Sequence, residues 1–309
     1  DDAAHSNCKW FPYNKGGEFR KWYGNNDYIV NWENNGFEIR NFKDEKGKLR
    51  SRPQNTDFYF RESASWSLVT SSVAAFRYKP TGSIFDVAGM SFFSKNNLYY
   101  LLALCNTKVV MEILKVIAPT INYQCGDIAN IPVLLEEEKK LIVTTTVQNN
   151  ITLSKTDWDS YETSWDFQKH PLFCTVSRLT DAYTAWKAEC EQRFLQLKAN
   201  EEELNRIFID IYGLQDELTP EVADKDVTVH RIFDIKDDVP ESMQGSSYVR
   251  TKRDEIVSLL SYAVGCMFGR YSVDVDGLAY AGGDWDDGKY KTFLPDRDGY
   301  RFTSWNTEP

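Results

Sequence analysis

The chain has 309 residues, of which 42% are hydrophobic and 14% aromatic. That length exceeds what one compact core usually holds, and the apolar content is too high for a disordered chain, so we expect two folded units. The formal net charge of -10 at pH 7 argues at first against a nucleic-acid partner, because DNA affinity rests largely on Lys and Arg meeting phosphates. A nucleic-acid partner would still be expected if the positive charges were concentrated in one part of the chain.

The charge is in fact unevenly distributed. Residues 1–135 contain 16 Lys and Arg against 13 Asp and Glu, whereas residues 136–309 contain 20 against 33. The two parts of the chain therefore face different partners. The densest basic segment has only Asp44, Glu45 and Asp57 as acidic residues, and it contains Arg40, Lys43, Lys46, Lys48, Arg50, Arg52 and Arg61. We predict phosphate contacts there.

Membrane insertion, secretion and metal binding are not indicated. The longest apolar stretch, residues 98–118, is interrupted by charged and polar residues, and the N-terminal residues lack a basic region followed by an apolar core. The six cysteines form no Cys-x-x-Cys pattern, and the three histidines lie far apart. We expect neither disulfides nor a metal site. These patterns predict a cytoplasmic protein that does not bind a membrane.

The first part of the chain predicts short strands. Aromatic and β-branched residues, punctuated by Gly, Asn and Pro, place them at residues 28–32, 36–42, 57–60 and 65–72. The polar segment 43–53 contains Gly47 and Pro53 and is placed as an exposed loop between strands. An exposed basic loop on a β-scaffold suits contact with a DNA groove.

From Asn96 onward the apolar spacing becomes helical. Leu98, Leu101, Leu102 and Cys105 share one face, and Asn106 or Thr107 can cap a second helix that ends before Pro119. Short extended pieces should follow, up to residue 133, before the next helix begins in the acidic segment 136–140.

This change of pattern suggests a domain boundary near residue 135. Residues 136–152, 175–212 and 252–268 have helical apolar spacing, whereas residues 280–302 are rich in Gly and Asp and should be irregular. The predicted fold class is α+β, with a mixed β-sheet domain over residues 1–135 followed by a mainly α-helical domain over residues 136–309.

One glycine-containing segment, PYNKGGEFRKWYGN at residues 12–25, has two interpretations. The Gly pair would let the chain approach a sugar-phosphate backbone while Lys15, Arg20 and Lys21 meet phosphates. Alternatively, the segment is a β-turn whose aromatic residues face the core and whose cations are merely solvated. Composition alone does not separate the two.

The sequence contains no complete catalytic motif. There is no Gly-rich turn that opens a helix after a strand and no Asn/Asp-Pro-Pro-aromatic motif, so we predict no catalytic residue and no cofactor bound by this chain. Asp284, Asp286, Asp287 and Lys289 could hold Mg²⁺ in a nuclease-like site. The fragment of a calcium loop at residues 274–277 lacks its later ligands. We favour solvated loops for both.

Several separated motifs carry a family resemblance. In chain order they are the segment at residues 12–25 with NWENNGFEIR, LLALCNTKVVMEILKVIAPTINYQCGDIANIPV, DWDSYETSWDF with HPL, LNRIFIDIYGLQDELTPEV, and LSYAVGCMFGRYSVDVDGLAYAGGDWDDGKYKTF. Together they resemble the C-terminal half of the PglX-type adenine-specific DNA methyltransferases of BREX phage-defence systems, which are similar in layout to type IIG restriction-modification enzymes. Residues 101–133 are also similar to the specificity domains of type I and TaqI-like systems.

The resemblance implies that DNA recognition and catalysis belong to different domains. Residues 1–135 would form a DNA target-recognition domain, and the later helices would pack against the catalytic and recognition domains. The catalytic domain, which is expected to bind S-adenosylmethionine, would lie upstream of this chain. Double-stranded DNA, the N-terminal methyltransferase domain and other defence-system proteins are the expected partners.

The predicted DNA contacts combine the basic segment with residues on either side of it. Arg50, Arg52 and Gln54, together with Asn122, Tyr123 and Gln124, are the predicted base readers. The remaining predicted contacts are Lys15, Arg20, Lys21, Arg40, Lys43, Lys46, Lys48, Arg61, Arg77, Tyr78 and Lys79. Two alternatives stay open, namely an interaction scaffold in which the acidic helical part docks partner proteins, and a metal-dependent nuclease fragment.

Overall fold

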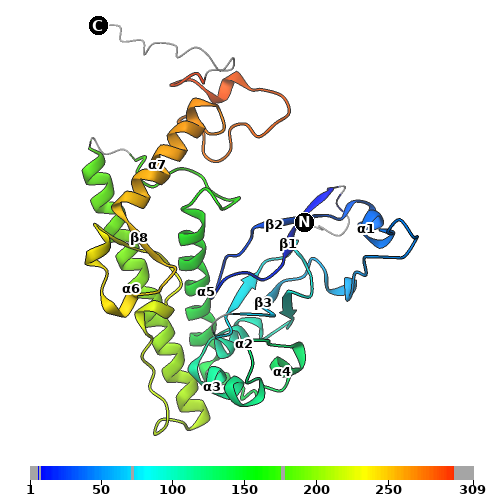
Figure 1. Ribbon diagram of the computed structural model, residues 1–309. Helices are drawn as coiled ribbons and strands as arrows, with labels where there is room; N and C mark the ends of the chain where they lie inside the picture. The colour runs from blue at the N-terminus through cyan, green and yellow to red at the C-terminus, as the bar shows by residue number, and fades with distance from the viewer. Residues whose placement is uncertain (1–5, 7, 71–72, 175–177, 296–309) are drawn as a thin grey trace. The chain divides into compact units, whose positions relative to one another are not determined.

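The computed structural model describes residues 6, 8–70, 73–174 and 178–295 (Figure 1). The chain divides into two compact units, of which unit 1 comprises Asp1–Lys155 and Gln196–Thr228, and unit 2 comprises Thr156–Leu195 and Val229–Pro309. Two long helices, α5 (Glu137–Asp159) and α6 (Leu179–Tyr212), contribute residues to both units. Each unit therefore combines segments that lie far apart in the sequence, and neither corresponds to residues 1–135 or 136–309 alone.

Unit 1 contains two small three-stranded sheets. The first has the order β2-β1-β5, with β1 antiparallel to β2 and parallel to β5, and its strands are β1 (Trp10–Asn14), β2 (Tyr28–Asn31) and β5 (Ile84–Phe85). The second is antiparallel with the order β4-β3-β6, and its strands are β3 (Ser63–Ser67), β4 (Phe76–Lys79) and β6 (Gly89–Phe92). A mixed β-structure in this part of the chain agrees with the prediction.

Two of the predicted strands are wrong. Residues 36–42 belong largely to helix α1 (Glu33–Arg40), whose start is distorted because Asn34, Asn35 and Gly36 have positive φ angles. A Cβ atom on Gly36 would lie 2.6 Å from the ring of Trp32, so only glycine allows this close packing. The segment predicted as a strand at 57–60 lies mostly in a 3₁₀ turn, η2 (Thr56–Phe58), followed by the buried Tyr59.

The strand predicted at residues 65–72 is confirmed only in its first part. It is β3, which begins two residues earlier, at Ser63, and ends at Ser67. Residues 71 and 72 lie outside the described part of the chain. The alternation that marks a half-exposed strand is absent from β3, because four of its five residues are buried.

The predicted helix pair is confirmed as α2 (Leu98–Cys105) and α3 (Lys108–Ile117). Thr107 occupies the N-cap position of α3 but makes no side-chain cap hydrogen bond there. Asn106 instead pairs with the backbone of β4, since its amide nitrogen donates to the carbonyl of Phe76 and its Oδ1 accepts from the amide of Phe76, both at 2.9 Å. The extended pieces expected next are interrupted by the short helix α4 (Cys125–Ala129).

The last part of α6 belongs to unit 1 and packs on this helix pair. The rings of Tyr100 and Phe208 meet edge to face with centroids 5.2 Å apart, and Oδ1 of Asn205 accepts a hydrogen bond of 2.9 Å from the backbone amide of Lys108. The side chain of Asn200 donates to Oδ1 of Asn150 on α5. These contacts explain why residues beyond 196 complete the first unit.

Unit 2 is mainly helical. Besides its parts of α5 and α6 it contains α7 (Lys252–Met267) and a two-stranded parallel sheet of β7 (Arg231–Phe233) and β8 (Val249–Thr251). Short 3₁₀ turns complete the described chain: η3 (Asp224–Asp226) in unit 1, and η4 (Lys236–Asp238), η5 (Glu241–Met243) and η6 (Asp287–Lys289) in unit 2. The α+β class is thus confirmed.

The helices predicted after residue 135 are also present, with shifted ends. The first extends to Asp159, the second begins at Leu179, and the third ends at Met267. Residues 175–177 and 296–302, which the predictions included, lie outside the described part of the chain. Among the described helices, none is both long enough and apolar enough to cross a membrane.

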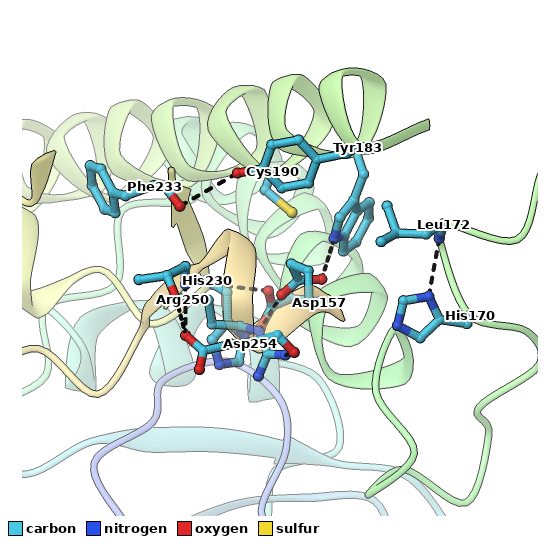
Figure 2. Close-up of polar contacts among 12 residues, drawn as sticks. Asp157, His170, Leu172, Tyr183, Cys190, His230, Phe233, Arg250 and Asp254 are labelled. Carbon is cyan, nitrogen blue, oxygen red and sulfur yellow. Dashed lines mark hydrogen bonds and ion pairs between the residues drawn. The ribbon is translucent and has the colours of Figure 1, made fainter. Parts of the chain in front are cut away.

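The core of unit 2 includes several buried charges (Figure 2). The carboxylate of Asp157 accepts hydrogen bonds of 2.9 Å from the backbone amide of His230 and pairs with its Nδ1, also at 2.9 Å. Glu255, whose side chain is 0% exposed, accepts hydrogen bonds from Nε1 of Trp186 and Nε of Arg250. These groups hold the helices and the small sheet of unit 2 together.

Candidate nucleic-acid interface

The basic segment forms a small exposed turn, which we call the basic hairpin and define as residues 42–50. Lys43 and Leu49 form an antiparallel bridge, and the backbone amide of Arg50 donates to the carbonyl of Phe42. Oδ1 of Asp44 accepts hydrogen bonds from the backbone amides of Lys46, at 3.0 Å, and Lys48, at 2.8 Å. The carboxylate therefore fixes the turn from within, and the predicted loop has a defined shape.

The cations of the basic hairpin and the residues just after it point to solvent. Lys43, Lys46, Lys48, Arg50 and Arg52 are all exposed. Arg50 donates through Nε to Oδ2 of Asp44 at 2.7 Å. Within the described residues, the structure shows no ion pair for the other four. Uncompensated surface cations of this kind are what a phosphate backbone binds.

Two further predicted arginines are exposed beside aromatic rings. The guanidinium of Arg40 lies 5.2 Å from the ring centroid of Trp32 and donates through Nε to the carbonyl of Asn35 at 2.8 Å. The guanidinium of Arg61 lies 5.0 Å from the ring centroid of Phe58. Both charges remain at the surface while their stems cover apolar residues.

A cavity of about 670 Å³ opens next to this segment in unit 1. One wall is the stretch Ser51–Asn55, which includes the predicted base readers Arg52 and Gln54. The other walls are a continuous series of rings: Trp32 meets Tyr59 with centroids 5.1 Å apart, Tyr59 meets Phe85 at 5.1 Å, and Phe85 meets Phe93 at 5.7 Å. The cavity volume lies within the range of about 300–1,000 Å³ found for small-molecule sites.

Asp86 supplies a carboxylate to the same cavity. Its Oδ1 accepts hydrogen bonds from the backbone amides of Ala88, at 2.8 Å, and Gly89, at 3.1 Å. Nζ of Lys15 lies 4.0 Å from Oδ2. Burial, together with the charge of Asp86 and a hydrogen bond to it, raises the pKa of Tyr13 far above its ordinary value. The Tyr13 hydroxyl therefore stays protonated and donates a hydrogen bond to the Asp86 carboxylate.

Four of the predicted phosphate contacts lie inside unit 1. Arg77 is 1% exposed and donates to the carbonyl of Arg20 and to Oγ of Ser67, both at 3.1 Å. Nζ of the buried Lys79 donates to the carbonyls of Gly24, at 2.9 Å, and Asn25, at 3.2 Å. Burial and the neighbouring Arg77 lower the pKa of Lys79 well below its ordinary value. These two side chains hold the segment at residues 20–25 in place.

The other two buried cations have the same character. Lys21 forms an ion pair with Glu201, which also accepts a hydrogen bond of 2.6 Å from Nε1 of Trp22. Arg20 is buried as well, with its backbone carbonyl bonded to Arg77. A Cβ on Gly16 would lie 2.6 Å from the carbonyl oxygen of Ala88, so the glycine makes a close approach to protein backbone. Trp22 and Tyr23 are buried, as the second interpretation expects, but Arg20 and Lys21 are buried as well and are not solvated.

The remaining predicted contacts are divided between surface and interior. The hydroxyl of the half-buried Tyr78 donates to Oε1 of Glu62 at 2.7 Å. Tyr123 is buried, and its carbonyl accepts a hydrogen bond of 2.8 Å from Nε1 of Trp66. Asn122 and Gln124 are exposed on either side of it.

The acidic turns of unit 2 are occupied by local hydrogen bonds. Oδ1 of Asp286 accepts from the amide of Gly288 at 2.9 Å, Nε1 of Trp285 donates to Asp287 at 2.7 Å, and Nζ of Lys289 donates to the carbonyl of Ala279 at 2.8 Å. Asp274 accepts from the amides of Lys291 and Thr292. Across the described ranges, no three His, Cys, Asp or Glu side chains gather in a way that could hold a metal ion.

Sequence reasoning missed the cavity. Its walls come from Trp32, Tyr59, Phe85 and Phe93, which lie in four separate segments, and its carboxylate follows β5. The aromatic richness of residues 57–60 is a signal for the cavity, although that pattern also predicts a strand. Arg52 and Gln54, which their side-chain chemistry predicts as base readers, lie in the same wall.

Comparisons with known proteins bear on the identity of the chain. No protein-family model matches it. It is 44% identical over 298 residues to the adenine-specific methyltransferase PglX of Lacticaseibacillus casei (strain Zhang), covering 94% of this chain and 23% of that protein. It is 34% identical over 311 residues to the adenine-specific methyltransferase BrxX of Escherichia coli O9:H4 (strain HS), covering 97% of this chain and 25% of that protein. The chain is homologous to a region of the PglX/BrxX adenine-specific methyltransferases that makes up about a quarter of their length.

Proposed function

We propose that this chain recognises DNA as the specificity region of an adenine-specific DNA methyltransferase of a BREX defence system. The observation that carries the proposal is the group of exposed cations in and just after the basic hairpin, directly beside an aromatic cavity with a carboxylate. Phosphate contacts made by Lys43, Lys46 and Lys48 would set the position of the duplex. Arg52 and Gln54 have the donor and acceptor groups that read base edges.

The activity of the complete enzyme is part of the same proposal. The two relatives are named as adenine-specific methyltransferases. We infer that the region described here selects the site, while a catalytic domain binds S-adenosylmethionine and transfers the methyl group. On this view the chain itself holds no methyl donor, and recognition is its contribution. Measuring S-adenosylmethionine binding by calorimetry tests this division, since saturable binding to this chain alone would contradict it.

Helix α7 has an exposed apolar row. Along this helix and just after it, Ile256, Val257, Leu260, Val264 and Phe268 are exposed. An exposed apolar row of this kind marks protein contacts, and we propose that it docks the methyltransferase domain. The double variant Leu260→Asp and Val264→Asp should abolish co-purification with a separately expressed domain. Lys252→Asp and Arg253→Asp, at the polar start of the helix, should not.

The test of DNA recognition is a salt titration. Lys43→Gln, Lys46→Gln and Lys48→Gln together should weaken binding of the chain to a labelled duplex about tenfold or more at 50 mM salt. The slope of log K against log salt should fall by about two to three, because each lost phosphate contact removes about 0.9 from it. Fluorescence anisotropy at four salt concentrations measures both quantities.

The control carries the same kind of charge change elsewhere in unit 1. Lys115 and Lys139 are exposed lysines on α3 and α5. Replacing both with Gln should leave affinity and slope within about twofold of the parent chain. If the two sets of variants behave alike, the basic hairpin is not the phosphate-binding surface.

A further inference from the structure

The cavity beside the basic hairpin has the features of a site for one unstacked nucleobase. We propose that it binds a base that bears an exocyclic amino group, such as cytosine, taken out of the DNA stack, with the Asp86 carboxylate accepting the amino hydrogens. This inference rests on the proposed DNA-binding function and goes beyond it, because it assigns a second kind of recognition to the same surface. The reasons lie in the walls, the carboxylate and the cations.

The walls of the cavity suit a flat aromatic ligand. Trp32, Tyr59, Phe85 and Phe93 form an unbroken series of rings, and Phe58 extends it, with its centroid 5.0 Å from that of Phe93. Stacking on protein aromatics is worth about 1–3 kcal/mol per base and tolerates any base. The walls therefore supply affinity without choosing between bases.

The choice between bases falls to Asp86. Its side chain is 21% exposed, and its fixed position comes from the two backbone amides bonded to Oδ1. A carboxylate has about four acceptor positions, and Ala88, Gly89 and Tyr13 account for three donors. One more donor fits, and aspartate accepts well from the N4 amino group of cytosine. A base with a carbonyl oxygen at that position would face the carboxylate with no hydrogen to donate.

Two cations lie beside the cavity. Lys15 is exposed and has its Nζ 4.0 Å from Asp86, while Arg52 lines the cavity and reaches solvent. Gln54 and Asn55, in the same wall, add amide groups for the remaining base edge. The cavity therefore combines aromatic walls, a carboxylate and two neighbouring positive charges, which together suit a nucleotide.

The experiment compares two oligonucleotides that differ at the amino position. Single-stranded (dC)12 and (dU)12 have unpaired bases and the same backbone charge, so the cations alone would bind them equally. We expect the 309-residue chain to bind (dC)12 about tenfold more tightly, measured by fluorescence anisotropy. Equal binding of the two oligonucleotides would overturn the inference while leaving the phosphate contacts intact.

Two variants locate the preference. Asp86→Asn keeps an oxygen for the amides of Ala88 and Gly89 but replaces the second acceptor with a donor, so the (dC)12 preference should disappear. Asp57→Asn changes the charge of an exposed aspartate that precedes the lining residue Phe58 in the sequence, and it should preserve the preference. Val87→Trp fills the cavity from an exposed lining position and should reduce (dC)12 binding to the (dU)12 level. A preference that survives in both Asp86→Asn and Val87→Trp contradicts the site.

Free nucleosides separate this inference from the DNA-binding proposal. Deoxycytidine, which has no phosphate, should give saturation-transfer NMR signals with the parent chain that Val87→Trp abolishes. If deoxycytidine binds and (dC)12 is preferred, but the triple lysine variant of the basic hairpin leaves oligonucleotide affinity unchanged, the base cavity stands and the phosphate-binding surface is wrong. If deoxycytidine gives no signal and the oligonucleotides bind with equal affinity, the cavity assignment fails on its own. Near-UV circular dichroism confirms that each variant is folded.

Discussion

The basic hairpin of unit 1 and the polar core of unit 2 use charged side chains in opposite ways. In the hairpin, Lys43, Lys46 and Lys48 point to water and are held only through their backbone, which Asp44 organises. In unit 2, Glu255 and Asp157 are fully buried, and donors surround them. A solvated cation is free to exchange water for phosphate, whereas a buried carboxylate is committed to its internal partners. Charge type alone therefore does not distinguish a binding residue from a structural one.

The largest effect should come from removing a buried carboxylate. Glu255→Ala removes the carboxylate that accepts from Nε of Arg250 and from the indole of Trp186. Breaking a buried pair in this way costs about 3–5 kcal/mol, so the midpoint of urea unfolding of unit 2 should fall sharply. Glu241→Ala, at an exposed position, should change stability by no more than about 0.5 kcal/mol. Similar losses in both variants would show that Glu255 is not a structural centre.

The next effect is a pH dependence. Burial, with a contribution from Arg250, lowers the pKa of His170 to about 4, and its side chain accepts a hydrogen bond from the amide of Leu172. The unfolded chain takes up this proton near pH 6.5, before the folded chain does. The neutral histidine therefore supports stability fully above about pH 6.5, and that contribution is lost as the pH falls toward 4.

His170→Asn should reduce this acid sensitivity, because asparagine offers an acceptor to Leu172 but does not titrate. On the order of 3 kcal/mol of the stability lost between pH 7 and 4 should be missing in the variant. Urea titrations of both proteins at a series of pH values provide the measurement. Parallel stability curves for the two proteins would place the acid-sensitive group elsewhere.

The smallest effect concerns the exposed turn. Asp44→Ala removes the acceptor for two backbone amides and for Arg50, but because this site is at the surface the global stability should fall by less than about 1 kcal/mol. The change should appear locally, as faster hydrogen exchange at the amides of Lys46 and Lys48, measured by NMR. Unaltered exchange at both amides would mean that the turn holds its shape without the aspartate.

The sequence predicted the helices better than the strands, for a physical reason. Helix α3, for example, buries Val109, Val110 and Leu114 on one face, which local apolar spacing reports. The strands have two to five residues, and their pairing depends on partners far along the chain, as in the pairing of Tyr13 with Ile84. The strand predicted at residues 36–42 is wrong because Asn34, Asn35 and Gly36 adopt left-handed conformations that interrupt an extended chain, and the following residues form a helical turn.

The site shows the same limit. The exposed basic hairpin followed from its polar composition and Gly47, which are local properties. The burial of Arg77 and Lys79 could not be predicted from local composition, because their acceptors are backbone carbonyls more than fifty residues earlier. Local composition thus identified the exposed basic hairpin. Which predicted cations are buried, and where the cavity forms, depend on long-range packing.

The discontinuity of unit 1 has a consequence for its synthesis. Lys21 pairs with Glu201, and the backbone amide of Lys21 donates to Oγ1 of Thr228 at 3.2 Å. At about 5–20 residues per second, the ribosome needs roughly 10–35 s to add the residues that separate this lysine from its carboxylate. During that interval the nascent N-terminal strands lack a partner that closes their fold. The strands near Lys21 therefore leave the ribosome well before the residues that complete unit 1.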